Sequence, residues 1–186
     1  IYLVSALPIW LSVIVVIIFT VALGCTIEEV AYRPLRSAPR MSIMISAIGV
    51  SYFLQNIALY VTGGLTKTYP SIPFLQKTVT VLGAHTKMVT VITPILTIAL
   101  VFALVMLINH TKIGMAMRAV SRDFETSELM GIDINRVIIV TFIIGSFLAA
   151  VGALLYFTNY PNVAITSGGM PGLKAFVAAV FGGIGS

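Results

Sequence analysis

Residues 137–160 read VIIVTFIIGSFLAAVGALLYFTNY, a run of 24 residues without a single Asp, Glu, Lys or Arg. It belongs to one of four long charge-free stretches, which cover residues 1–27, 41–66, 88–111 and 137–173. Each is long enough to cross the roughly 30 Å hydrocarbon core of a bilayer, which takes about 20 residues as an α-helix. A chain of 186 residues cannot hide four such helices inside a globule. The sequence therefore predicts an all-α fold, a polytopic bundle of transmembrane helices.

Composition supports the same fold class, because 59% of the residues are apolar and only 9% are charged, against roughly a quarter charged in soluble domains. We expect one transmembrane domain, with spans at about 3–26, 41–62, 88–108, 137–160 and 173–186 onward. The last segment is either a re-entrant half-helix or a full span that continues past Ser186. Because the chain starts at Ile1 without Met and stops in an apolar, glycine-rich run, we expect a fragment that lacks elements at both ends.

The first span has one competing interpretation, a signal peptide. Residues 22–25, Ala-Leu-Gly-Cys, bear a faint resemblance to a lipoprotein cleavage site. No basic segment precedes the apolar run and no soluble domain follows it, so a membrane span is favoured.

The loops between the spans differ in basic charge. Those at 28–40 and 110–136 hold seven of the eleven Lys and Arg residues, whereas the loop at 63–88 holds three and the loop at 161–172 holds none. Since cytoplasmic loops carry the excess of Lys and Arg, we expect the first two loops inside the cell and Ile1 outside. Within the outer loop at 63–88, a β-branched run over residues 78–82 predicts a small hairpin or an irregular cap.

Several kinds of site are disfavoured because their motifs are missing. Scattered basic residues without interleaved aromatics argue against nucleic-acid binding. The glycine-rich segment at 168–174 lacks the Gly-Lys-Ser/Thr order of an ATP-binding phosphate loop, because Leu173 precedes Lys174. The two histidines have no partner at metal-ligand spacing. No charged residue lies well inside the four long spans, so we expect the energy for any transport to come from elsewhere.

The most specific part of the sequence is the segment at 110–136. Residues 113–130 suit one amphipathic helix outside the bilayer. Its apolar stripe, near the 3.6-residue period, comprises Met117, Val120, Phe124 and Leu129. Gly131 suits a left-handed end for this helix, and Asp133 suits the N-cap of the next one. A helix that lies passively among lipid headgroups, with its two arginines toward the phosphates, is the competing interpretation.

Polar side chains interrupt the second span. They are Ser46, Ser51, Gln55 and Asn56. Buried amides are costly in lipid unless they are paired, so we expect these residues to face the bundle interior. They either form hydrogen bonds between helices or line the path of a zwitterionic substrate.

Small residues form a strip on the fourth span. Gly145, Ala149 and Ala153 recur every four residues, and Ser146 and Ala150 widen the strip. Small residues at this spacing let helices approach closely, so we expect this strip to be a packing surface.

A resemblance to a known family rests on several short motifs. Glu125, two small residues and, after three more, Gly131 match the spacing of the Glu-Ala-Ala-x-x-x-Gly loop of ABC importer permeases, although Thr and Ser replace the two alanines. Further matching segments are residues 31–36 (AYRPLR), 45–49 (ISAIG), 53–56 (FLQN), 174–176 (KAF) and 182–186 (GGIGS). Together they resemble the branched-chain amino-acid ABC transporter permeases of the LivH type.

The resemblance implies the membrane-spanning permease subunit of an ATP-driven bacterial importer for leucine, isoleucine and valine. Such a subunit is a multi-pass protein of the inner membrane and is not an enzyme. Its implied partners are a second permease subunit, two cytoplasmic ATP-binding subunits and an extracytoplasmic solute-binding protein. No cofactor is expected in this chain, because the ATP-binding subunits use the ATP.

The resemblance also implies a role for the cytoplasmic segment, which would sit in a cleft of the ATP-binding subunit and transmit its movement. The coupling residues are Arg118, Arg122, Asp123, Glu125, Leu129 and Gly131. A permease of the same family for urea, amides or other amino acids is the alternative within this class. Alternatives outside the class of ABC importer permeases are a passive channel, an ion-coupled carrier and a membrane scaffold without transport.

Overall fold

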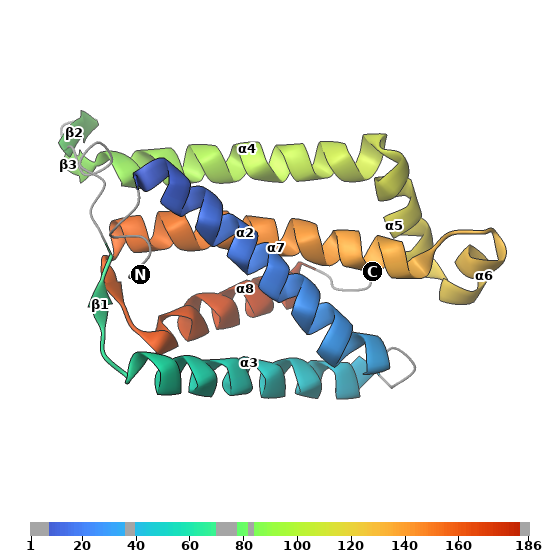
Figure 1. Ribbon diagram of the computed structural model, residues 1–186. Coiled ribbons are helices and arrows are strands. Elements are labelled where there is room, and N and C mark those ends of the chain that lie inside the picture. The colour runs from blue at the N-terminus through green and yellow to red at the C-terminus, as the bar shows by residue number, and fades with distance from the viewer. Residues whose placement is uncertain (1–7, 36–39, 70–77, 82–83, 183–186) are drawn as a thin grey trace.

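The computed structural model describes residues 8–35, 40–69, 78–81 and 84–182. Its α-helices are α2 (Ile9–Ile27), α3 (Arg40–Thr62), α4 (Met88–His110), α5 (Lys112–Arg122), α6 (Phe124–Leu129), α7 (Ile134–Asn159) and α8 (Gly169–Phe181). The strands are β1 (Lys67–Thr68), β2 (Thr78–Val81), β3 (Ala84–Lys87) and β4 (Asn162–Val163). The long helices lie side by side, with the strands at one end of the bundle and α6 at the other (Figure 1).

Within the described residues, four helices are long and apolar enough to cross a membrane, which confirms the all-α polytopic bundle. In lipid, a helix satisfies every backbone group internally, so uninterrupted apolar runs become uninterrupted helices. α3, α4 and α7 begin and end within three residues of the bounds expected from the sequence. Residues 3–7 of the first expected span lie outside the described part of the chain.

The first long helix continues past its expected end at residue 26. α2 passes directly into a π-helical turn, η1 (Glu28–Tyr32), and then a 3-10 turn, η2 (Arg33–Leu35). In η1 the Arg33 N–H bonds to the Glu28 carbonyl five residues earlier. The helical rod therefore carries charged residues at the end of the bundle where α6 lies (Figure 1).

The most extensive contact between helices joins α2 to α7, which lie diagonally across one another (Figure 1). A Cβ atom built on Gly24 would overlap the Ser146 hydroxyl, so the α2 backbone approaches α7 as closely as a glycine permits. Further along the same crossing, the rings of Tyr32 and Phe142 lie 5.2 Å apart at 55°. Ala150 is buried on this side of α7.

The expected packing strip on α7 is confirmed along one edge, at Ser146 and Ala150, and wrong along the other. Gly145, Ala149 and Ala153 are exposed, and a Cβ on Gly145 would meet nothing within 4 Å. Ser146 lies against Gly24 of α2 and Ala150, one turn further along α7, is buried, because one position along a helix turns the side chain by about 100° away from the exposed residues.

Two small sheets close one end of the bundle. β2 and β3 form an antiparallel hairpin with Thr80 opposite His85, which confirms the strand expected in this loop; residues 82 and 83 lie outside the description. β1 pairs with β4, so that Thr68 faces Asn162 and the Tyr69 N–H bonds to the Pro161 carbonyl at 2.7 Å. The two loops that were expected to share a side of the membrane therefore meet in one sheet.

The last element is shorter than a membrane span. After β4 the chain forms a 3-10 turn, η3 (Ile165–Gly168), and then the 13-residue helix α8. This helix runs from the strand end of the bundle back between α3 and α7 in the view of Figure 1. The 13 residues of α8 amount to about 20 Å at 1.5 Å per residue, and both forms expected for this segment, a half-helix and a longer span, remain predictions.

Candidate functional site

The segment expected to form a single helix over residues 113–130 consists of two. α5 ends at Arg122, Asp123 adopts an extended conformation with φ −152° and ψ 115°, and α6 follows. The expectation of one continuous helix is therefore wrong. α5 contacts α4 and α7, whereas α6 projects at the end of the bundle (Figure 1).

α5 is held in place by its first residues and by its apolar face. The Thr111 hydroxyl accepts a hydrogen bond from the Gly114 N–H at 3.0 Å and donates to the Leu107 carbonyl at 2.6 Å. Val120 is buried, and Arg118 donates from Nη1 to the Asn109 side-chain oxygen at 3.3 Å. These contacts fix α5 to the end of α4.

The break at Asp123 has a clear chemical cause, since this residue is the N-cap of α6. Its Oδ1 accepts from the N–H groups of Glu125 at 3.0 Å and Thr126 at 3.3 Å, and its Oδ2 accepts from the Thr126 hydroxyl. The Thr126 hydroxyl and backbone N–H, followed by the Glu125 N–H, lower the pKa of Asp123 from its ordinary value of 3.8. The carboxylate therefore has a structural task within the segment.

Gly131 ends α6 as expected from the sequence. Its φ is +81°, in the left-handed region that favours glycine. The Gly131 N–H bonds to the Glu128 carbonyl at 2.9 Å and the Ile132 N–H to the Ser127 carbonyl at 3.1 Å. These two bonds form a Schellman motif, which turns the chain sharply out of the helix. Two residues later Asp133 caps α7 by accepting from the Arg136 N–H at 3.1 Å, which confirms the second cap expected there.

The result is a short helix fixed at both ends and open on its outer surface. Each proposed coupling residue is exposed: Arg118, Arg122, Asp123, Glu125, Leu129 and Gly131. Leu129 has 88% and Met130 78% of its surface exposed, and Phe124 has 53%. The expected apolar stripe is therefore divided: Val120 is buried against the bundle, while Phe124 and Leu129 face outward. An exposed apolar surface rimmed by charge is typical of a protein docking site.

The four polar residues of α3 do not share one face. Ser51 and Gln55 lie together, and Gln55 Nε2 donates to Ser51 Oγ at 3.3 Å. Asn56 Nδ2 donates to the Tyr52 carbonyl at 2.8 Å. Ser46 is nine residues from Gln55, which places it about 180° around the helix. The amide nitrogens thus bond within α3, and the alternative of hydrogen bonds between helices receives no support from these contacts.

Sequence reasoning missed Glu28. This carboxyl side chain is only 1% exposed, although it lies at the end of a membrane-crossing helix. It is four residues after Gly24 and four before Tyr32, the two residues that contact α7. The four-residue spacing from two contact positions is the signal that predicts burial on that face.

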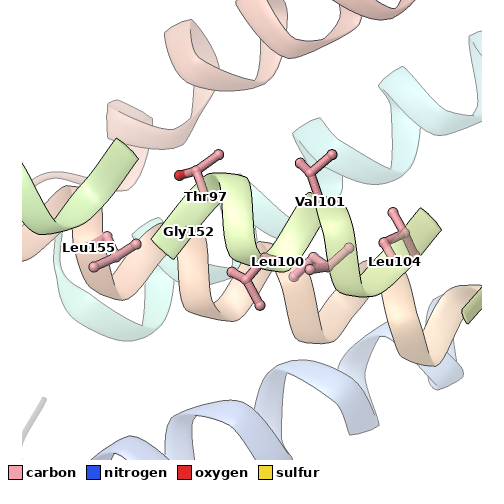
Figure 2. A pocket seen from close by; sticks show the side chains of 7 residues that line it. Thr97, Leu100, Val101, Leu104, Gly152 and Leu155 are labelled. Atoms are coloured by element: carbon pink, nitrogen blue, oxygen red, sulfur yellow. The ribbon is translucent and has the colours of Figure 1, made fainter. Parts of the chain in front are cut away.

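A cavity of about 230 Å³ opens between α4 and α7 (Figure 2). Its lining residues are Thr97, Leu100, Val101, Leu104, Leu148, Gly152 and Leu155. The one hydroxyl among them, on Thr97, donates to the Thr93 carbonyl at 2.8 Å. With its polar group already bonded, the cavity suits hydrocarbon and not a zwitterion. Among the residues described, no three His, Cys, Asp or Glu side chains come together to hold a metal ion.

Comparisons with known proteins find a family of membrane transport components. The family described as branched-chain amino acid transport system / permease component matches residues 1–186. The high-affinity branched-chain amino acid transport system permease protein BraD of Pseudomonas aeruginosa is 39% identical over 173 residues, which are 91% of this chain and 56% of BraD. LivH of Escherichia coli K12, which carries the same description, is 40% identical over 174 residues, with the same two coverages.

A more distant relative is the xylose/arabinose import permease protein XylH of Sulfolobus acidocaldarius, 31% identical over 120 residues, or 62% of this chain and 30% of XylH. The chain spans about half the length of the branched-chain relatives it matches. No solved structure matches it significantly.

Proposed function

The chain belongs to the family of branched-chain amino acid transport system permease components, and on that premise we propose that it forms the membrane pathway of an ATP-driven importer for leucine, isoleucine and valine. The observation that carries this proposal is the family match over the whole chain, with 40% identity to a LivH protein over 91% of it. Its four long apolar helices suit a multi-pass protein of the bacterial inner membrane.

In this proposal the energy comes from partner subunits. The permease works with a second permease subunit, two cytoplasmic ATP-binding subunits that use the ATP, and an extracytoplasmic solute-binding protein that delivers the amino acid. The chain itself carries no cofactor and catalyses no reaction. Its sequence supports this division of labour, because the glycine-rich segment at 168–174 has no phosphate-binding order of residues.

Coupling runs through α6. A short helix that is capped at both ends moves as a rigid body, so a push on its outer surface reaches α5 and α7 without being absorbed by bending. Leu129 supplies the apolar contact with the ATP-binding subunit. Arg118, Arg122 and Glu125 supply rim charges that set orientation more than affinity, while Asp123 and Gly131 hold the shape of the helix.

The substrate passes along α3. Ser51 and Gln55 form one polar patch and Asn56 a second one on an adjoining part of the helix, whereas Ser46 serves another face. Modest polarity of this kind lets a zwitterion pass without being retained, which a permease requires.

The test is uptake of radiolabelled L-leucine by the complete assembly reconstituted in proteoliposomes. We expect uptake only when both ATP inside and the solute-binding protein outside are present. Uptake that continues without ATP while an ion gradient is kept would identify an ion-coupled carrier, and uptake down a concentration gradient alone would identify a channel. No binding-protein-dependent uptake of leucine, isoleucine or valine would overturn the proposal.

A further inference from the structure

Lys174 carries a charge in a part of the molecule where charge is otherwise missing. It is the sixth of the 13 residues of α8, GMPGLKAFVAAVF, and the helix has no other charged or hydroxyl-bearing side chain. No other charged residue occurs between residue 137 and the end of the printed sequence. An ionisable residue on an apolar membrane helix is expensive unless an opposite charge, a backbone carbonyl or water stabilises it, which marks it as a candidate functional site.

The sequence of this chain offers no such partner near α8. All six Asp and Glu residues lie at 28–29 or within 123–133, at the α6 end of the bundle. α7 separates that end from β4, and its 26 residues amount to about 39 Å at 1.5 Å per residue. Lys174 lies only about 7.5 Å along α8 from the helix start, which follows β4 by way of η3. An anion that pairs with this lysine would therefore have to come from outside the printed chain.

The described residues leave Lys174 and its helix largely uncovered. Lys174 is exposed, as is every residue of α8 from Gly172 to Phe181. A Cβ atom built on Gly168, Gly169 or Gly172 would meet nothing within 4 Å, so no described side chain blocks the approach along the start of the helix.

α3 brings acceptor groups to a similar depth. α3 contacts η3, the turn that leads into α8. Asn56 is six residues before the end of α3, about 9 Å of helix, which is comparable to the depth of Lys174 along α8. Because the amide nitrogens of Gln55 and Asn56 donate within α3, their oxygens are available as acceptors for an ammonium group.

We propose that the Lys174 ammonium binds the α-carboxylate of an amino acid in the outer half of the transport path. This assignment rests on the proposed import of branched-chain amino acids and adds the group that recognises the common part of those substrates. The substrate carboxylate supplies the missing counter-charge as it enters, and the pairing is strong enough to hold the backbone of the substrate while leaving its side chain unread.

The test compares two ligands that differ at the carboxylate alone. The complete assembly in lipid nanodiscs, without the solute-binding protein, is titrated with L-leucine and L-leucinamide at a pH where both amines are protonated. We expect the wild-type assembly to bind leucine about tenfold more tightly than leucinamide, in line with a charge-assisted hydrogen bond. K174M should bind both ligands equally weakly, and K174R should keep the preference.

K87M is the matched control, because it removes another exposed lysine at the strand end of the bundle, outside α3 and α8. It should behave as the wild type. No measurable leucine binding by the wild type, no preference for leucine, or a preference that survives in K174M would overturn the assignment. A K174M assembly that loses subunits but keeps the ligand preference would show that a carboxylate of a partner subunit is the counter-charge, and would overturn it too.

Leucine uptake by the same purified assemblies, reconstituted in proteoliposomes with the solute-binding protein outside, separates this inference from the function on which it rests. An assembly that imports leucine with ATP but does not distinguish leucine from leucinamide overturns the role of Lys174 alone. An assembly that hydrolyses ATP and imports no branched-chain amino acid overturns the proposed function.

Discussion

Gly24 of α2 lies against Ser146 of α7 so closely that a Cβ atom on the glycine would occupy the position of the serine hydroxyl. This contact sets the crossing of the two helices, and the Tyr32–Phe142 ring pair continues it toward the charged end of α2. Ala150, one turn beyond Ser146 on α7, is buried. Among the long helices described, Gly24 is the glycine whose Cβ atom would overlap a neighbouring helix.

G24A should therefore destabilise the helix pair. Overpacking by one methyl group in a tight contact typically costs about 1–3 kcal/mol. We expect a lower midpoint of thermal unfolding for the purified protein in detergent. G145A is the control, since a Cβ at Gly145 meets open space. Equal midpoints for the two variants would show that α2 and α7 do not cross at Gly24.

G131V should uncouple ATP hydrolysis from uptake. At φ +81° a residue with a Cβ is strained by roughly 1–2 kcal/mol, so the chain would leave α6 in a different direction and the lever would change shape. The measurement is leucine imported per ATP hydrolysed, which we expect to fall several-fold. G131N should stay near the wild type because asparagine tolerates the left-handed region. An unchanged ratio in G131V would contradict the role given to α6.

D123A should loosen the first turn of α6. Loss of the N-cap leaves the Glu125 and Thr126 N–H groups without their acceptor, and we expect their amide hydrogen exchange to be several-fold faster. D123N should retain much of the protection because asparagine is also a good cap. Fast exchange that is equal in wild type and D123A would contradict the cap.

The same cap should depend on pH in one direction. The pKa of Asp123 is lowered on folding, so its contribution to stability is fully present above its ordinary value of 3.8 and is lost as the pH falls through the lower, folded-state value. Protection of the Thr126 amide should accordingly persist below pH 3.8 and decline at more acidic pH. In D123N this step should be absent, and a step above 3.8 would show that the carboxylate is not stabilised as described.

T68C/N162C should form a disulfide under mild oxidation. Tyr69 and Pro161 are the hydrogen-bonded pair of this ladder, so Thr68 and Asn162 are the adjacent non-hydrogen-bonded pair. Such pairs have Cα atoms about 4.5 Å apart, within the range that a disulfide bridges. The test uses a C25S background and counts free thiols by mass spectrometry. T68C/A164C, which is two residues out of register, should remain reduced for longer.

The strand end of the bundle should face the outside of the cell and α5 the cytoplasm. In a C25S background, a membrane-impermeant thiol reagent added to intact cells should label T68C, at the strand end, and should spare S121C on α5. Both positions are exposed. Labelling of S121C from outside would place α6 on the wrong side for contact with an ATP-binding subunit.

The sequence predicts the long helices well because a backbone segment surrounded by lipid must form its hydrogen bonds internally, as a helix does. The lengths of the charge-free stretches therefore set the bounds of the helices. The caps at Gly131 and Asp133 are also local, since each depends on its own residue type. The break at Asp123 is less visible: its side chain competes with the helix for backbone N–H groups, and the outcome depends on Thr126 and on the docking of α5.

Features that depend on contact with a second helix cannot be predicted from the residue pattern of one segment alone. The small strip on α7 is visible in the sequence, but whether Gly145 or Ser146 faces a neighbour is decided by where α2 crosses. Burial of Glu28 follows from the same crossing. The sequence shows that Gln55 and Asn56 are polar. Whether their amides form hydrogen bonds within α3 or with another helix depends on which residues lie opposite them.

The interior formed by the described residues is very small. Within the described residues, the buried apolar side chains are Val89, Val120, Val137 and Ala150, whereas large side chains such as Trp10, Phe102 and Phe181 are mainly exposed. Most of the free energy that keeps the helices together must then come from their surroundings. The acyl chains of the surrounding lipid or detergent, more than packing among the described residues, should set how long the purified protein stays folded.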